Sequence, residues 1–179
     1  MKKFKNLAAL TAFSMAFVLV FSLPSLAQTP KLTDPEIASV AVVANQIDIN
    51  YAAIAKEKSK NAEVLRFAET MTNDHKAIIA QAVELVTKLK VTPQDNAVSQ
   101  KLNADAEKTK KLLLKKSGKA FDKAYIDNEV AYHKAVIAAV TGLLIPEAQN
   151  AELKALLGKV VPALNAHLAH AEMVQKNFK

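Results

Sequence analysis

The fold is decided by the stretch NAEVLRFAETMTNDH at residues 61–75, which contains no glycine or proline and repeats its apolar residues at steps of three and four. The same period continues to residue 89, with His75 as its one polar member. Its apolar members are Val64, Ala68, Met71, Ile78, Ala82, Leu85 and Leu89. This spacing predicts one long amphipathic helix that starts after Asn61 and stops at Thr92-Pro93.

Working outward from this helix, the same period returns in three more long segments. A capping box at Thr33-Asp34-Pro35-Glu36 opens a helix that runs to about residue 58. Further helices are expected at about 121–145 and about 148–177, and a weakly amphipathic connector helix at about 95–116. The motif Asn-Ala-Glu followed by valine or leucine occurs at residues 61 and 150, which predicts two long antiparallel hairpins of similar design.

The first 27 residues differ from the rest. Met1–Lys5 carry three lysines, residues 6–23 carry no charge, and Ser25-Leu26-Ala27 ends the segment with small residues. This pattern predicts a signal peptide cleaved after Ala27, and therefore a periplasmic or extracellular protein that is not integral to the membrane. Residues 28–33 are expected to be a disordered lead-in and residues 34–179 a single helical domain. Without the signal the formal charge falls from +7 to 21 − 17 = +4.

The sequence of 179 residues contains no cysteine. A lipid-anchored lipoprotein, a disulfide scaffold, a thiol enzyme and a thiolate metal site are therefore excluded. Histidine and carboxylate side chains remain as the principal candidates for metal ligands.

All four histidines fall at matched heights in the two hairpins. Asp48 and His75 lie 13 and 14 positions from the turn near residue 61, while His133 and His167 each lie 17 positions from the turn near residue 150. Glu129 and His170 lie 21 and 20 positions from that second turn. Imidazole and carboxylate groups bind zinc, copper or iron, and bundles place such sites between their helices. The candidate ligands are Asp48, His75, Glu129, His133, His167 and His170. The alternative is that each histidine is an ordinary core or edge residue.

No enzyme is predicted. Di-iron bundles carry Glu-x-x-His motifs, and this sequence contains none; the nearest pattern, Glu129 to His133, is spaced by four. Met71 and Met173 could ligate copper, although a methionine in an apolar stripe is usually a packing residue.

The connector region is rich in lysine. Its eight lysines are Lys101, Lys108, Lys110, Lys111, Lys115, Lys116, Lys119 and Lys123. The alternative function is therefore an interaction module that docks on anionic envelope material without a metal. Nucleic acid is excluded as a partner, since the sequence has one arginine and no aromatic stacking platform. A solvated helix face is the simpler explanation of the lysines.

The chain resembles a known family at three separated motifs. Residues 61–75 resemble the signature V..FA..M..DH, residues 121–133 resemble FD..Y.......H, and residues 162–168 resemble P.L..HL. The family is domain of unknown function 4142, whose members are exported proteins often described as predicted outer membrane proteins. The resemblance implies a ferritin-like four-helix bundle and emphasises His75, His133 and His167. It implies no established reaction.

Overall fold

The computed structural model describes residues 31–178 of the protein. The predicted signal peptide (1–27) and the first part of the predicted lead-in (28–30) lie outside these residues. Within 31–178 the chain is helical apart from short joints, as the periodicity predicts. The elements are α1 (Asp34–Lys58), α2 (Ala62–Leu89), α3 (Ala97–Leu114), α4 (Gly118–Ala139), the π-helix η1 (Val140–Leu144), α5 (Ile145–Glu147), α6 (Ala151–Gln175) and the 3-10 turn η2 (Lys176–Phe178).

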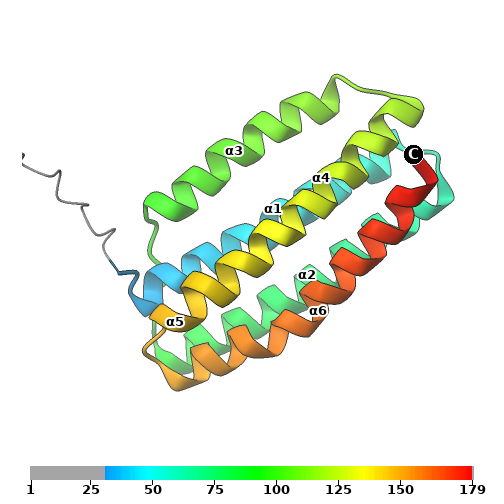
Figure 1. Cartoon of the computed structure of the whole chain (residues 1–179). Helices are drawn as coiled ribbons and strands as arrows, with labels where there is room; N and C mark the ends of the chain where they lie inside the picture. Colours follow the sequence, from blue (N-terminus) through cyan, green and yellow to red (C-terminus); the bar gives the residue numbers. More distant parts are fainter. Residues whose placement is uncertain (1–30, 179) are drawn as a thin grey trace, which may run out of the picture. The chain divides into compact units, whose positions relative to one another are not determined.

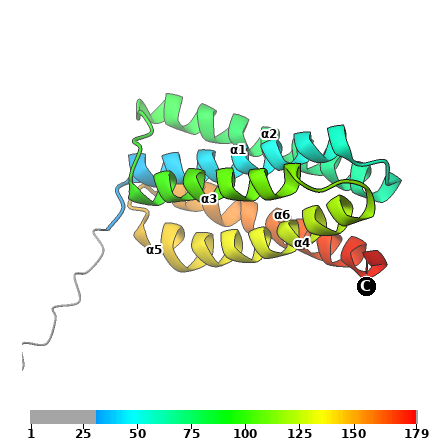
Figure 2. The same ribbon diagram turned by 90° about the horizontal axis from the view of Figure 1, so that it is seen from above.

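Four long helices pack side by side, and α3 lies outside them against α1 (Figures 1 and 2). α1 packs most extensively on α2, and α4 packs most extensively on α6, so each hairpin forms an antiparallel pair. The two pairs meet where α2 contacts α6 and where α1 contacts α4. The described residues therefore form a helical bundle with one added peripheral helix.

The two hairpins begin their second arms in the same way. The Asn61 side chain caps α2 by accepting hydrogen bonds from the backbone N–H groups of Glu63 and Val64. The Asn150 side chain caps α6 with the equivalent pair of bonds, from Glu152 and Leu153. Such caps satisfy N–H groups that the first turn of a helix leaves free. The repeated sequence motif is thus a repeated helix start.

Several predicted boundaries shift. α2 ends at Leu89, before the predicted stop at Thr92-Pro93, because Lys90 adopts a left-handed backbone with φ of 54°. α4 starts at Gly118, three residues before the expected start. The helical backbone that begins with α4 does not end at Ile145-Pro146. It continues as the π-helix η1, whose turns are wider, and then as α5. Apolar periodicity carries no signal for such a widened turn.

The end of the lead-in is tied to the bundle. The backbone N–H of Leu32 donates a hydrogen bond of 2.7 Å to Glu147 Oε2, and the Leu32 side chain packs on the apolar cluster around Leu144. Asp34 accepts hydrogen bonds from the N–H groups of Gln149 and Asn150, which joins the start of α1 to the start of α6. The two hairpins are therefore locked together at this end.

Two helical stretches, Asp34–Lys58 and Gly118–Glu147, are long and apolar enough by composition to cross a membrane. The core helices of a bundle meet the same criteria. Both stretches pack on other helices here, and both carry fully buried acidic groups, Asp48 and Glu129.

The bundle core is divided into two apolar clusters. One surrounds Phe67, Phe121 and Tyr125, and the other surrounds Ile37 and Leu144. Each of the four long helices has a buried polar residue where the two clusters meet; on α2, α4 and α6 it separates the residues of one cluster from those of the other, and on α1 it directly follows Ile47. These residues are Asp48 on α1, His75 on α2, His133 on α4 and His167 on α6. A polar layer thus crosses the middle of the bundle.

Candidate metal centre

The polar layer consists of side chains from all four long helices, and each is almost completely buried. Asp48 is 0% exposed, His75 3%, His133 1% and His167 4%. Each occupies a position where the apolar stripe of its helix would otherwise place a core residue, which directs it inward. Burying four polar groups is costly unless they are paired or bind a ligand.

The three imidazoles meet at one place. Their ring centroids are 5.1 Å apart for His75 and His167, 5.5 Å for His133 and His167, and 5.8 Å for His75 and His133. One ligand atom from each ring lies within 4.8 Å of the others. Since the rings come from α2, α4 and α6, only the packing of the two hairpins creates this cluster.

One nitrogen of each ring is held by an outer partner. His75 Nδ1 lies 2.7 Å from Asn45 Oδ1, and His167 Nε2 lies 2.9 Å from Asp74 Oδ2. His133 Nδ1 lies 3.0 Å from the backbone carbonyl oxygen of Glu129. These partners are acceptors, so each outer nitrogen carries the proton in the neutral ring.

The remaining nitrogens are consequently lone-pair donors. His75 Nε2, His133 Nε2 and His167 Nδ1 have no hydrogen-bond partner among residues 31–178. Outer hydrogen bonds of this kind fix the tautomer and the orientation of metal-binding histidines in proteins. The arrangement therefore offers three oriented lone pairs in a buried space.

Asp48 adds a carboxylate to this space. Its Oδ2 atom lies 3.3 Å from His75 Nε2 and 3.4 Å from His133 Nε2. Neither carboxylate oxygen has a hydrogen-bond partner in the described part of the chain. A tetrahedral ion with bonds of about 2.0–2.1 Å holds its ligand atoms about 3.3–3.4 Å apart. The spacing of Asp48 from the two imidazoles fits that geometry.

Glu129 lies at the edge of the same cluster. It forms a second possible group with Asp48 and His133, in which ligand atoms also lie within 4.8 Å of one another. Complete burial, together with repulsion from Asp48, raises the pKa of Glu129 well above its ordinary value. This shift favours the protonated form of the carboxyl group, which binds metal ions less well than a carboxylate.

Burial acts on the histidines in the opposite direction. Loss of hydration lowers the pKa values of His133 and His167, although nearby Asp48 and Asp74 oppose the effect. Both rings are consequently neutral at pH 7. Neutral imidazole is the form that binds metal ions, so no proton has to leave these two groups first.

The structure brings together five of the six predicted residues: Asp48, His75, Glu129, His133 and His167. His170 lies elsewhere, because its ring packs against Phe67 with centroids 5.1 Å apart. The sequence count pairs His170 with Glu129 in a second layer, and the structure does not bring these two residues into one cluster of possible ligands. One turn further along α6, the side chain reaches the neighbouring apolar cluster instead of the layer.

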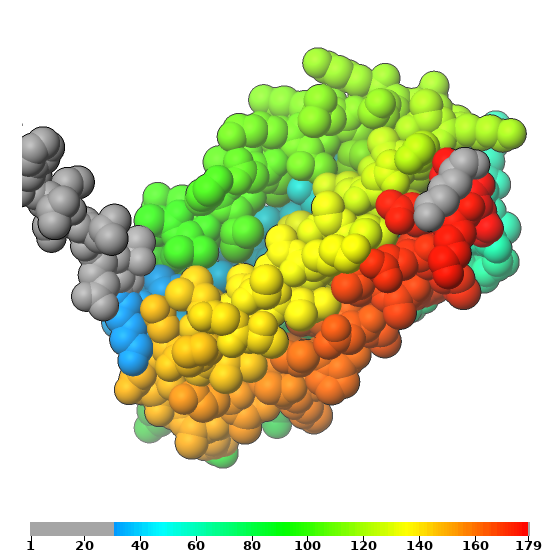
Figure 3. Space-filling model, viewed as in Figure 1, coloured from blue at the N-terminus to red at the C-terminus, as the bar shows by residue number. Residues whose placement is uncertain are grey.

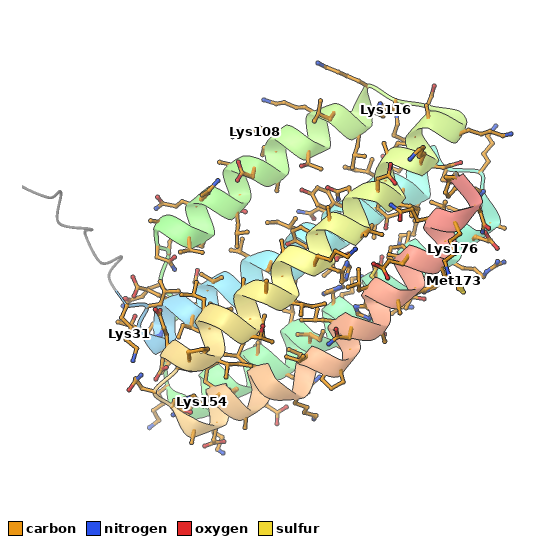
Figure 4. All side chains as sticks on the ribbon, in the orientation of Figure 1. Lys31, Lys108, Lys116, Lys154, Met173 and Lys176 are labelled. Atoms are coloured by element: carbon orange, nitrogen blue, oxygen red, sulfur yellow. The ribbon has the colours of Figure 1, made fainter. Side chains whose placement is uncertain are left out.

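Neither methionine belongs to the centre. Met71 is fully buried in the apolar cluster around Phe67, as expected for a packing residue. Met173 is 57% exposed near the end of α6, where Figure 4 labels it.

Sequence reasoning missed the outer partners. Asp74 precedes His75 directly, and consecutive helical residues point about 100° apart, so His75 turns toward α1 while Asp74 reaches His167 on α6. The Asp-His pair in the first motif was the available signal. Asn45, one turn before Asp48, could be found in the same way, as a polar residue beside the predicted layer.

The geometry defines a class of site: a buried layer of three histidines and one carboxylate in a helical bundle. The chain belongs to the family described as "Domain of unknown function (DUF4142)", whose profile matches residues 22–174. This confirms the family that the three motifs suggest.

The solved structure described as "CopM in the Cu(II)-bound form" is similar in fold. The similarity has a TM-score of 0.61 and covers 83% of this chain and 100% of that chain, at 16% sequence identity. At this identity it shows a shared fold. No curated protein matches the chain.

Proposed function

We propose that this protein binds one divalent transition-metal ion through His75, His133, His167 and Asp48. The observation that carries the proposal is the cluster of three buried imidazoles, each with one unpartnered nitrogen. Beside it lies Asp48, whose Oδ2 is 3.3 Å from His75 and 3.4 Å from His133, a spacing that suits a small tetrahedral ion. A bound cation would neutralise the buried charge of Asp48 and give each lone pair a partner.

Zinc and copper are the metals that this set of ligands favours. Imidazole suits both ions, and the affinity order places Cu(II) above the other divalent ions of the series. The similar fold of CopM, whose title gives a Cu(II)-bound form, makes copper the first metal to test. Iron is the third candidate, with weaker support, because no Glu-x-x-His motif supplies bridging carboxylates.

The physiological role that we propose is metal buffering or protection in the cell envelope, by a ferritin-like bundle that is exported and has no catalytic activity. Export rests on the signal-like sequence of residues 1–27. The non-catalytic role rests on the sequence, which contains no Glu-x-x-His motif. A fully buried centre suits retention of an ion better than rapid exchange with a large substrate.

Calorimetric titration of residues 28–179 with Zn(II) and with Cu(II) tests the proposal. We expect one ion per chain and a loss of at least about 100-fold in affinity in the single variants His75→Gln and His133→Gln. His170→Gln is the matched control, because that ring packs outside the layer. Equal binding by all four proteins, or no binding by the wild type, would contradict the proposal.

A second candidate function rests on α3, which lies at the periphery. Lys108 on α3 and Lys116 just after it extend away from the bundle (Figure 4). Leu112 and Leu114 of α3 are exposed at 60% and 46%. Basic groups next to exposed apolar side chains suit an anionic lipid surface.

Four of the eight lysines in this region already form ion pairs within their own helix, which weakens this candidate. They are Lys101, Lys108, Lys110 and Lys123. Sedimentation with vesicles of anionic or neutral lipid tests docking. Binding only to anionic vesicles, lost in Lys115→Glu/Lys116→Glu, would support the candidate, and absence of binding at low salt would remove it.

A further inference from the structure

A cavity of about 480 Å³ lies beside the polar layer. Its wall is formed by α1, α2, α3, α4, η1 and α6, and Figure 3 shows a hollow between α3 (green) and α4 (yellow) with α1 (blue) at its floor. This volume falls within the range of small-molecule binding sites, and such sites are found between the helices of bundles.

The wall is almost entirely aliphatic. Alanine, valine, leucine and isoleucine supply most of its residues, and α4 contributes a row of alanines at Ala131, Ala135 and Ala139. Because an alanine side chain ends at Cβ, a row at intervals of four leaves the space between α3 and α4 unfilled. These three alanines are exposed, so the cavity opens to solvent along this row, and its apolar wall favours an apolar ligand.

The polar residues of the wall include three members of the candidate metal centre, beside Asn45, Asp105, Thr109 and Asn128. Asp48, His75 and His133 all line the cavity and are at least 97% buried. In the described residues, both oxygens of Asp48 and the Nε2 atoms of the two histidines lack hydrogen-bond partners. These four atoms accept hydrogen bonds, and Asn128 Nδ2 in the same wall is an unpartnered donor. Acceptors therefore outnumber donors among the unpartnered polar atoms of the wall.

The π-helix also borders this space. Val140 and Leu144, its first and last residues, line the cavity. π-turns are uncommon and occur frequently at functional sites. The widened turn therefore lies against the same cavity that ends at the polar layer.

We propose that the cavity binds a small apolar molecule with one hydrogen-bond-donating end, of the class of a medium-chain alcohol. The apolar body lies along the aliphatic wall, and the hydroxyl group donates to Asp48. The apolar part of this site does not depend on a bound metal. A carboxylate end is repelled by Asp48 in the metal-free protein, whereas a bound cation neutralises the charge of Asp48 and removes this repulsion.

Fluorescence titration of metal-free residues 28–179 with N-phenyl-1-naphthylamine, an apolar dye with one N–H, tests the proposal. We expect saturable binding of one dye per chain and displacement by 1-decanol. Ala135→Phe fills the cavity and should weaken dye binding at least about tenfold. Ala138→Phe is the matched control, since both alanines are exposed on α4 and only Ala135 lines the cavity.

Absence of saturable binding, or equal binding by the two phenylalanine variants, would overturn the proposal. Decanoate tests the polar end: it should displace the dye only after Zn(II) is added, and equal displacement without metal would overturn the role of Asp48. Zn(II) calorimetry on Ala135→Phe keeps the two sites separable. That variant should bind the ion as the wild type does. Loss of dye binding with normal metal binding therefore concerns the cavity alone, and absence of metal binding concerns the metal centre.

Discussion

Replacing Asp48 with asparagine tests the metal centre most directly, because it removes one charge and almost no volume. Asp48 Oδ2 lies 3.3 Å from His75 Nε2 and 3.4 Å from His133 Nε2. The amide group of asparagine can donate to these lone pairs, which the carboxylate cannot do. We therefore expect the metal-free variant to be more stable than the metal-free wild type by about 1–3 kcal/mol, the usual cost of an unsatisfied buried polar group.

The same substitution removes the only charged ligand of the proposed ion. We expect at least about 100-fold weaker metal binding. At a free metal concentration of about 100 times the wild-type Kd, binding stabilises the wild type by about 2.7 kcal/mol, whereas a Kd raised 100-fold leaves about 0.4 kcal/mol. For a domain of this size each kcal/mol moves Tm by about 2–4 °C, so metal should raise Tm by about 5–11 °C in the wild type and by about 1–2 °C in the variant.

Thermal denaturation followed by circular dichroism, with and without Zn(II) or Cu(II), measures both effects. Glu129→Gln is the matched control, because burial raises the pKa of Glu129 and the protonated carboxyl group resembles an amide. It should keep most of the metal-dependent shift. Equal shifts in the wild type and Asp48→Asn, or a metal-free variant that is less stable than the wild type, would refute the reasoning.

Three further predictions concern groups around the centre. Burial lowers the pKa values of His133 and His167, so the unfolded chain binds more protons than the folded protein at acidic pH. The metal-free protein should therefore lose stability as pH falls below about 6.5. Urea denaturation at several pH values should show a smaller loss of stability in the variant with glutamine at both positions. Asp74→Asn weakens the outer partner of His167, and calorimetry should show a metal affinity reduced about 10–100-fold with unchanged helix content, since Asp74 is half exposed. His170→Ala should leave metal affinity unchanged while lowering Tm slightly through its lost packing on Phe67; a large loss of affinity would place His170 in the centre after all.

The helical content and the hairpin plan could be predicted from the sequence because they depend on local patterns. The stripe from Val64 to Leu89 and the caps at Asn61 and Asn150 act within one or two turns of their own helix. The helix boundaries at Leu89 and after Ala139 depend on backbone conformation, which the apolar period does not show. The left-handed Lys90 and the π-helix at Val140–Leu144 leave no mark in the apolar period.

Counting positions from each turn also predicted the pairs Asp48 with His75 and His133 with His167. That count uses only the antiparallel geometry of each hairpin, and both pairs are close in the structure. The count could not show whether the pair of residues from the first hairpin lies in the same layer as the pair from the second hairpin. The same count placed His170 at the height of Glu129, whereas in the structure its ring packs on Phe67 of α2.

The sequence by itself therefore determined the helices, their pairing into hairpins and the family, because periodicity, caps and motifs are local properties of the chain. Only the tertiary structure decided that His75 of the first hairpin joins His133 and His167 of the second, with Asp48 between them. The physical reason is that the relative height and rotation of the two hairpins are set by side-chain packing at α1–α4 and α2–α6, and by the link from Asp34 to the start of α6. These contacts join residues that are distant in sequence, so no local pattern records them.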